Sequence, residues 1–337
     1  MKKTAPLTIA AVGIFVAVSV QPGAAETTIR AASFTAPQAT TISVVMQPWM
    51  DAVEKDVGAE VGFQAFWGGA LGRNPVQQYE LLVNGIADVA FIVPSYTLAQ
   101  FPEMSVFSLP YLFRSGDEAS TAAWRMYEKG ILTGFDKVHP VTIYASDNNA
   151  LHLSKPIRTL EEVKGMKIRT AGPQESDLIR LFGATPVGMG MPTVTESISR
   201  GVIDGTLQSW TGVRSFRVAN VTKGHVEEPL GTLSFVIGMN KDAYMKLPQA
   251  VRESMDRHGG LGMAKRGGVG FDTTSEAYSA ELKKDASRSF IAVEGAEAEK
   301  REAMFLPLHD EWKKSVADGA KKYKALTQIL EDIRAGR

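Results

Sequence analysis

Hydrophobic residues along this chain alternate between two spacings, and the alternation predicts strands separated by helices. Short apolar runs at 28–33, 61–66 and 89–93 predict strands, and the last is apolar throughout, as in a buried and mainly parallel sheet. Between these runs, apolar residues recur at helical spacing over 41–57 and 75–84. Strands and helices in this order are typical of a wound α/β domain.

The rest of the chain repeats this order and then becomes mostly helical. Strands are predicted at 141–145, 166–170, 206–211 and 234–239. Helices are predicted at 119–129, 174–182, 193–199, 243–257, 271–288, 297–316 and 320–333. The glycine-rich run 258–262 is predicted to be a turn between two of these helices. Gln208 and Trp210 lie two positions apart in one predicted strand, so they are expected to share a face.

Two short segments match each other, and each lies between a predicted helix and a predicted strand. Both place a glycine at the helix end, Gly85 or Gly201, and an aspartate three residues later, Asp88 or Asp204. Glycine readily adopts the positive φ that ends many helices, and aspartate bonds backbone amides where the chain turns. The match suggests two similarly built lobes, and common loop chemistry explains it equally well.

The segment 154–210 contains the arginine on which a binding function depends. Thr159 and Glu162 match a capping box at the start of a short helix, and the strand that follows places Lys167 and Arg169 on one face. An unpaired charge is costly in a protein interior. Arg169 is therefore expected to pair either with a carboxylate of the protein or with an anionic ligand. From this segment alone, the ion pair within the protein is the more common arrangement.

The N-terminal residues predict export from the cytoplasm. Lys2 and Lys3 precede an apolar segment at 9–20, and small residues at 23–25 predict cleavage after Ala25. This is the pattern of a secretory signal peptide, with a retained membrane anchor as the alternative. The chain contains no cysteine, so lipid attachment at a cysteine is impossible and stability must come from packing rather than from disulfides. We therefore expect a periplasmic protein.

Composition and motifs argue against several functional classes. The formal net charge of the 337 residues is zero, which argues against a nucleic-acid-binding protein, and the length predicts two domains. The sequence contains neither a P-loop nor a nucleophile elbow. Its histidines lack metal-ligand spacing, and His152 is expected in a polar hinge loop, with contact to a ligand as the alternative. We therefore expect neither an enzyme nor a bound cofactor or metal.

Two sequence motifs resemble those of a known family. The run from Leu160 to Arg169 (LEEVKGMKIR) and the later run from Gly201 to Gly205 (GVIDG) are similar to motifs of the DctP-like solute-binding subunits of TRAP transporters. The resemblance covers essentially the whole chain after the signal peptide. It implies two α/β lobes joined by crossing strands, a long helix spanning both, and a ligand-binding cleft between them. It also implies a receptor that delivers a small organic carboxylate to small and large integral membrane subunits of a permease.

The same resemblance implies which residues bind the ligand. The arginine that matches Arg169 would hold a substrate carboxylate through two parallel bonds, for which its planar and permanently charged group is suited. Gln208 would bind the same carboxylate, and Trp210 would pack over the ligand body, with an ordinary interdomain core as its alternative role. Further contacts, or alternatively simple backbone caps, are expected from Phe34, Thr35, Ser95, Tyr96, Asn148 and Asn149.

Two departures from the family pattern narrow the expected ligand. Relatives that bind their ligand through a metal tend to carry a glutamate beside the tryptophan, whereas this chain reads QSWT from Gln208 to Thr211. Metal-assisted binding is therefore not expected, because hard cations prefer charged oxygen ligands. The second arginine of sialic-acid-binding relatives is also missing, and Asn149 lies near its place. A small or medium monocarboxylate, aromatic or aliphatic, is favoured.

The resemblance also defines expected domain boundaries and leaves two rival functions. The expected parts are a signal peptide at 1–25, lobe I at 26–147 plus about 234–265, lobe II at 148–233 plus about 266–310, and a C-terminal helix at 311–337. One rival is a periplasmic binding protein that serves a sensor or an ABC-type importer. The other is a periplasmic enzyme on the same fold, which the missing catalytic motifs disfavour.

Overall fold

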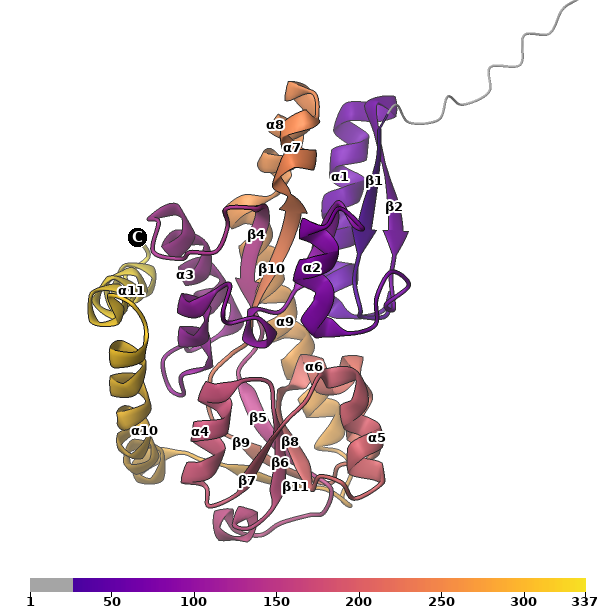
Figure 1. The fold of residues 1–337 in the computed structure, drawn as a ribbon. Coiled ribbons are helices and arrows are strands. Elements are labelled where there is room, and N and C mark those ends of the chain that lie inside the picture. Colours follow the sequence, from indigo (N-terminus) through magenta and orange to yellow (C-terminus); the bar gives the residue numbers. More distant parts are fainter. Residues whose placement is uncertain (1–26) are drawn as a thin grey trace, which may run out of the picture.

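The computed structural model describes residues 27–337, so the predicted signal peptide and its cleavage after Ala25 lie outside the described residues. The described residues form two lobes, each built on one mixed sheet, and the C-terminal helices lie along one side of both (Figure 1). Among residues 27–337, no helix combines the length and the apolarity that a membrane crossing would need.

The sheet of the first lobe has the strand order β2-β1-β3-β10-β4. Its strands are β1 (Thr27–Ala32), β2 (Val61–Phe66), β3 (Val89–Ile92), β4 (Val138–Ala145) and β10 (Ser234–Asn240). β1 pairs in parallel with β2 and β3, whereas β10 runs antiparallel to β3 and β4. β10 enters this sheet after the chain has passed through the second lobe, so the two lobes are not consecutive in sequence.

The sheet of the second lobe has the strand order β11-β9-β5-β8-β6-β7. Its strands are β5 (Asn149–Leu153), β6 (Lys167–Thr170), β7 (Thr185–Gly188), β8 (Gly205–Ser209), β9 (Gly224–Glu227) and β11 (Ser289–Ala292). The hydrophobic pattern did not predict β5, β9 and β11. These strands are short and carry polar residues, and it is their pairing with neighbours that makes them strands.

Helices cover the faces of both sheets. In the first lobe they are α1 (Gln47–Val57), α2 (Gln78–Val83), α3 (Gly116–Glu128), α7 (Lys241–Lys246) and α8 (Gln249–His258). In the second lobe they are α4 (Pro173–Leu181), α5 (Val194–Ser199) and α6 (Trp210–Ser215). The remaining long helices are α9 (Gly260–Leu282), α10 (Gly295–Ser315) and α11 (Gly319–Arg334). Short turns of helix are η1 (Thr41–Met46), η2 (Gly58–Glu60), η3 (Pro75–Gln77), η4 (Pro94–Tyr96), η5 (Pro102–Ser108), η6 (Leu160–Val163), η7 (Met191–Thr193) and η8 (Val218–Asn220).

The long helix α9 lies against both lobes. It packs on α3 and β4 of the first lobe and on α6 of the second. A Cβ atom at Gly268 would lie 2.5 Å from the carbonyl oxygen of Gly116, and one at Gly267 would lie 2.9 Å from the ring of Tyr144. Glycines here permit close packing of the helix. The predicted turn between two helices over 258–262 is present but shorter, because α8 ends at His258 and α9 begins at Gly260.

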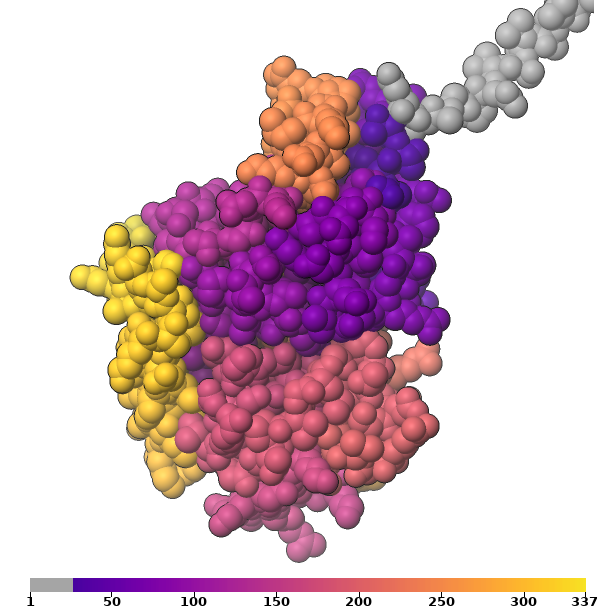
Figure 2. Space-filling view, in the orientation of Figure 1, coloured from indigo at the N-terminus to yellow at the C-terminus, as the bar shows by residue number. Residues whose placement is uncertain are grey.

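The other long helices join the lobes on the outside. α10 packs against α4 of the second lobe, and α11 packs against α3 of the first. Figure 2 shows these yellow helices beside both lobes. The predicted single helix over 243–257 is wrong, because Leu247 and Pro248 separate α7 from α8. Proline lacks the amide hydrogen that would continue the helical bonds.

The matching glycine–aspartate segments make equivalent hydrogen bonds in the two lobes. Asp88 accepts a bond from the backbone amide of Arg30 on β1 (2.8 Å), and Asp204 accepts one from the amide of Lys167 on β6 (2.8 Å). The amides of Asp88 and Asp204 in turn donate to the carbonyls of the same two residues, at 2.9 and 2.8 Å. Each aspartate therefore fastens its loop to the neighbouring strand.

The strand β8 ends earlier than the sequence pattern predicts. Ser209 caps the helix α6, since its hydroxyl accepts a bond from the amide of Gly212 at 3.2 Å. Serine is a preferred residue at this position because it satisfies a free amide at the start of the helix. Trp210 is consequently the first residue of a helix, and the prediction that it shares a strand face with Gln208 is wrong.

Candidate functional site

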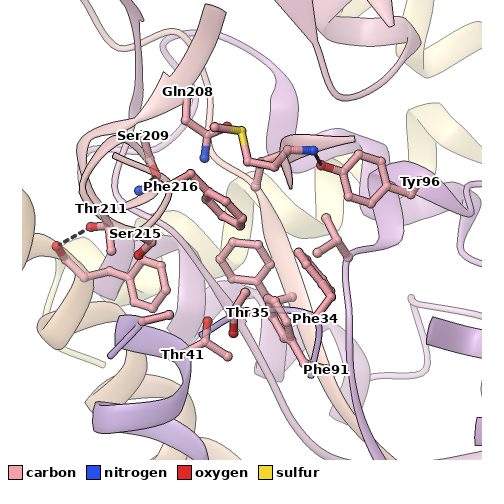
Figure 3. A pocket seen from close by; sticks show the side chains of 17 residues that line it. Phe34, Thr35, Thr41, Phe91, Tyr96, Gln208, Ser209, Thr211, Ser215 and Phe216 are labelled. Carbon is pink, nitrogen blue, oxygen red and sulfur yellow. Dashed lines mark hydrogen bonds between the residues drawn. The ribbon is translucent and has the colours of Figure 1, made fainter. Parts of the chain in front are cut away.

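A cavity lies between the two lobes (Figure 3). The first lobe contributes residues that follow β1 and residues at the end of β3, while the second contributes the end of β8 and the helix α6. β10 and α9 complete the wall. Among the described residues, none of those lining this cavity is an aspartate, glutamate, lysine or arginine.

Phenylalanine rings form a continuous wall of this cavity, which we call the aromatic cavity. The ring centroids of Phe34 and Phe91 lie 5.4 Å apart, and Phe34 also stacks on Phe216 at 6.5 Å. The series continues from Phe91 to Phe235 at 5.2 Å and from Phe235 to Phe271 at 5.6 Å. Aromatic rings prefer these separations. The wall therefore joins rings from both lobes and from α9 into one apolar surface.

Arg169 lies directly behind this cavity and is 0% exposed. Its Nε donates to the carbonyl of Met189 (2.9 Å), and its Nη1 donates to the side-chain oxygen of Gln208 (3.0 Å) and the carbonyl of Leu207 (3.4 Å). Its Nη2 donates to the hydroxyl of Tyr96 (2.8 Å). All of these acceptors are uncharged. A carboxylate of the protein nevertheless lies nearby: burial raises the pKa of Glu175, and the charge of Arg169 counteracts this rise. Glu175 is bonded by Asn149 and by the amide of Ala171 rather than by the guanidinium. The structure therefore leaves both predicted arrangements of Arg169 open.

Tyr96 and Gln208 stand between the guanidinium and the cavity, because both bond Arg169 and both line the cavity. Tyr96 belongs to the first lobe and Arg169 to the second, so their hydrogen bond crosses the cleft. The position of Gln208 depends on Gly212. A Cβ atom at Gly212 would lie 1.8 Å from Nε2 of Gln208, so the glutamine side chain occupies space that only glycine leaves open.

A buried pair of histidines supports Gln208 from behind. The Nδ1 atoms of His152 and His225 lie 3.0 Å apart, and Nε2 of His152 lies 3.0 Å from the carbonyl oxygen of Gln208. Burial lowers the pKa of His152 to about 3 and that of His225 to about 2, so both rings are neutral near pH 7. His152 then donates to Gln208 through Nε2 and accepts from His225 at Nδ1. The expected place of His152 in a hinge loop is wrong, since it lies within β5.

Trp210 lies away from the aromatic cavity, although the sequence placed it over the ligand. Its ring packs on His152, His225 and Phe290, with centroid distances of 4.5, 4.9 and 6.1 Å. Its side chain lines a second hollow instead. Its backbone amide donates to Asp147 (2.9 Å) in the link between β4 and β5. The early end of β8 explains this placement, because the helix turns Trp210 away from the side chain of Gln208.

The second hollow, which we call the acidic pocket, lies beside the links between the lobes. Its carboxylates are Asp147, Glu227, Glu228, Asp272 and Glu276. Burial raises the pKa of Asp147 to about 6. The structure thus places opposite chemistry in the two hollows: neutral and aromatic in one, acidic in the other.

The remaining predicted residues divide between these hollows. Phe34 and Thr35 line the aromatic cavity, together with Tyr96 and Gln208. Asn148 and Asn149 line the acidic pocket, where their amide nitrogens donate to the carbonyl of Phe113 (3.2 Å) and to Glu175 (3.4 Å). Ser95 is buried near its neighbour Tyr96 and lines neither hollow.

Several cavity residues were missed by the sequence reasoning. They are Thr41, Phe91, Met191, Phe216, Phe235 and Phe271. Phe91 and Phe235 lie in strands that the hydrophobic pattern does predict, and a search of residues near the strand ends would have found them, because ligands gather there in α/β folds. Phe216 and Phe271 carry no such signal, since only the packing of α6 and α9 brings them to the cavity.

Within residues 27–337, no group of three or more histidine, cysteine, aspartate or glutamate side chains is arranged to hold a metal ion.

The sequence profile of the family described as bacterial extracellular solute-binding protein, family 7 (DctP), matches residues 32–315. The chain belongs to this family. The prediction made from the LEEVKGMKIR and GVIDG motifs is thereby confirmed.

Curated relatives of the family share moderate identity with this chain. A solute-binding protein of Verminephrobacter eiseniae is 28% identical over 246 residues, which are 68% of this chain and 70% of that protein. The uncharacterized protein YiiZ of Salmonella typhimurium is 30% identical over 161 residues, and the chain spans about half of its length, 48%. The C4-dicarboxylate-binding protein DctP of Rhodobacter capsulatus is 22% identical over 240 residues.

Solved structures of the family share the whole fold. A TRAP solute-binding protein of Rhodoferax ferrireducens, in complex with copurified benzoate, is 27% identical with a TM-score of 0.83, covering 91% of this chain and 98% of that one. A marine metagenome protein specific for aromatic acid ligands, crystallized with 3-hydroxybenzoate, is 25% identical with a TM-score of 0.84 over the same shares. The predicted two-lobed α/β fold is confirmed by these similarities.

Proposed function

We propose that this chain is the solute receptor of a TRAP transporter, which captures a small organic carboxylate between its lobes. The observation that carries the proposal is Arg169, a fully buried cation whose hydrogen-bond acceptors are all neutral. A buried charge favours a nearby opposite charge. The buried Glu175 lies near enough to feel the charge of Arg169, but its bonds go to Asn149 and to the amide of Ala171. The lining of the aromatic cavity adds no charge among the described residues, so an anionic ligand would be the directly bonded charged partner of Arg169.

The residues at the cavity end nearest Arg169 are suited to a carboxylate. The amide of Gln208 and the hydroxyl of Tyr96 both line the cavity and both bond the guanidinium. A carboxylate entering here would accept bonds from these two groups and from the Nη atoms as the side chains adjust. Charge-assisted bonds of this kind are roughly twice as strong as neutral ones. The family's structural neighbours with copurified benzoate and co-crystallized 3-hydroxybenzoate support the same ligand class.

The hydrogen bond between Tyr96 and Arg169 supports a mechanism of lobe closure. It joins the first lobe to the second across the cleft, and opening the lobes would break it. Hinge closure around ligands is an established motion of periplasmic binding proteins. A ligand that contacts residues of both lobes binds the closed state better than the open one, which is the condition for shifting the equilibrium. The closed protein would then be recognised by the permease.

The proposal includes the other parts of the transport system. The predicted signal peptide, cleaved after Ala25, would deliver the mature chain to the periplasm, and the partners would be small and large integral membrane subunits. Nucleic acid, metal and cofactor have no part in it, and the protein binds its ligand without chemical conversion. The rival partners, a sensor or an ABC-type importer, would be distinguished by neighbouring genes, since only the TRAP reading requires genes for one small and one large membrane subunit.

A thermal-shift experiment with acid and amide pairs tests the proposed ligand class. The mature protein, from Glu26, is unfolded in urea, dialysed to remove copurified ligand and refolded, and its midpoint is measured with benzoate, benzamide, 2-oxobutyrate, 2-oxobutyramide, succinate and succinamide. At 100 times Kd a ligand adds about 2.7 kcal/mol of stability, or several degrees at about 2–4 °C per kcal/mol. We expect at least one acid to raise the midpoint while its amide does not. Equal shifts by acid and amide, or none with any acid, would contradict the proposal.

A further inference from the structure

We infer that the ligand is a monocarboxylate with one aromatic ring that carries a neutral hydroxyl at the end remote from the carboxylate. This inference rests on the proposed function, and it names the substrate class of the same site. Three features of the aromatic cavity carry it: the charge of its lining, the arrangement of its rings, and the hydroxyl groups across from Gln208.

The charge of the lining limits the ligand to one negative group. Arg169 lies behind one end of the cavity, and the lining residues in the described part of the chain carry no formal charge. A second carboxylate, or the ammonium group of an amino acid, would be enclosed without a partner of opposite charge. Burying an unpaired charge is far more costly than burying a neutral polar group. The cavity therefore selects against dicarboxylates and zwitterions.

The rings of the wall favour a flat aromatic ligand over an aliphatic one. Phe34 stacks on Phe91 and on Phe216 at interplanar angles of 21°, so their faces are nearly parallel. Such faces offer offset-stacking surfaces to another flat ring, which gains interaction beyond simple area burial.

Hydroxyl groups form a second polar end of the cavity. In Figure 3, Thr41 lies across the cavity from Gln208, with phenylalanine rings between them. The hydroxyl of Thr41 bonds the hydroxyl of Tyr144 (2.9 Å), and that of Thr211 donates to the carbonyl of Phe271 (3.2 Å). A hydroxyl offers one donor and two acceptor sites, so each retains capacity for one more partner. A neutral phenol hydroxyl on the ligand would use this remaining hydrogen-bonding capacity without bringing a second charge into the cavity.

Isothermal titration calorimetry of the refolded mature protein tests this inference with matched acids. The ligands are 3-hydroxybenzoate, 4-hydroxybenzoate, benzoate, cyclohexanecarboxylate, L-phenylalanine, succinate and isophthalate, which replaces the hydroxyl of 3-hydroxybenzoate by a second carboxylate. We expect one hydroxybenzoate to bind at least as tightly as benzoate, and benzoate about tenfold tighter than cyclohexanecarboxylate. Isophthalate, succinate and L-phenylalanine are expected to bind at least about 100-fold more weakly than the hydroxybenzoate.

Substitutions of cavity residues test whether the aromatic cavity causes these differences in ligand affinity. Thr41→Val should weaken the favoured hydroxybenzoate severalfold while leaving benzoate unchanged, and Phe91→Leu should reduce the preference of benzoate over cyclohexanecarboxylate. Trp124→Phe on α3, whose indole nitrogen donates to Glu128 (2.8 Å) and which does not line this cavity, is the control and should change neither ratio.

The outcomes separate this inference from the proposed function. If succinate, isophthalate or cyclohexanecarboxylate bound most tightly, the inference of an aromatic monocarboxylate ligand would be wrong. The proposal that the protein is a carboxylate receptor would still stand. If Thr41→Val weakened benzoate and hydroxybenzoate binding equally, only the claim that this end of the cavity binds the ligand hydroxyl would be wrong. Binding of none of these acids would overturn both proposals together.

Discussion

The two hollows beside the links between the lobes differ in the sign of the charge that they favour. The aromatic cavity has a neutral lining with the buried cation of Arg169 behind it, whereas the acidic pocket gathers carboxylates, among them Asp147 and Asp272. An anion is therefore favoured in the first. In the second, the carboxylates outnumber the basic lining residue Arg114, so an anion is disfavoured there. The difference teaches that the charge around a hollow distinguishes the aromatic cavity as the site that we propose for the ligand.

A single turn of the chain separates these hollows. Gln208 ends β8 with its side chain at the aromatic cavity, and Trp210 begins α6 with its ring at the acidic pocket. The His152–His225 pair lies against both, because His152 bonds the carbonyl of Gln208 and packs on Trp210. Changes at Arg169, at the histidines and at Gly212 therefore test different parts of one arrangement.

The largest expected effect follows the removal of the charge behind the aromatic cavity. In Arg169→Met, carboxylate affinity should fall by about 2–5 kcal/mol, because the ligand loses its charged partner. Arg169→Lys should recover part of this loss, since lysine keeps the charge but not the planar pair of donors. Calorimetry with the best carboxylate measures both. Arg180→Ala, on the exposed surface of α4, is the control, and unchanged affinity in Arg169→Met would contradict the site.

The pH dependence of stability is the next largest effect. Both buried histidines have a pKa below the ordinary value of about 6.5. As the pH falls, the histidines of the unfolded chain therefore take up protons before those of the folded protein, which favours unfolding. The contribution of the neutral histidine pair to the free energy of unfolding is complete above pH 6.5 and is lost as the pH falls towards 3. Each histidine should contribute a slope of about 1.4 kcal/mol per pH unit within that window. Urea unfolding between pH 7 and 4.5 measures it.

A histidine variant separates this effect from other buried groups. Asp147 acts in the opposite sense, because its raised pKa of about 6 makes its contribution decrease as the pH rises from about 4 to 6. We therefore compare slopes between His152→Asn and the parent chain, with Arg180→Ala on the exposed surface of α4 as the control. The slope should decrease only in His152→Asn, and an unchanged slope would refute the assignment to the pair.

The smallest expected effect comes from a single methyl group beside Gln208. In Gly212→Ala, the new Cβ meets the side-chain amide of Gln208 and displaces it, because the two cannot occupy the same space. Carboxylate affinity should fall by about 1 kcal/mol, a cost typical of mild overpacking. Gly262→Ala in α9, whose added Cβ has no neighbour within 4 Å, should leave affinity unchanged. Equal affinities in both variants would show that the glutamine does not hold the ligand.

The local patterns of the chain predicted much of the frame of this site. Thr159 and Glu162 do form the predicted capping box, with the amide of Thr159 donating to Glu162 at 3.1 Å, and the strand that follows does carry Arg169 into the interior. These features depend on residues a few positions apart, so their physics is contained in the sequence. The strand face predicted for Trp210 was wrong for the converse reason: one serine cap ended the strand early, and the helix that follows turned Trp210 away from the side chain of Gln208.

The sequence by itself determined the alternation of strands and helices, the glycine–aspartate joints at Asp88 and Asp204, and the family to which the chain belongs. The tertiary structure alone decided which side chains meet between the lobes. Phe34, Phe91, Phe216 and Phe271 are far apart in the sequence, and they form one wall because β10 returns to the first sheet and α9 packs against both lobes. Contacts of this kind depend on packing over long separations along the chain, which no local pattern of hydrophobic and polar residues records.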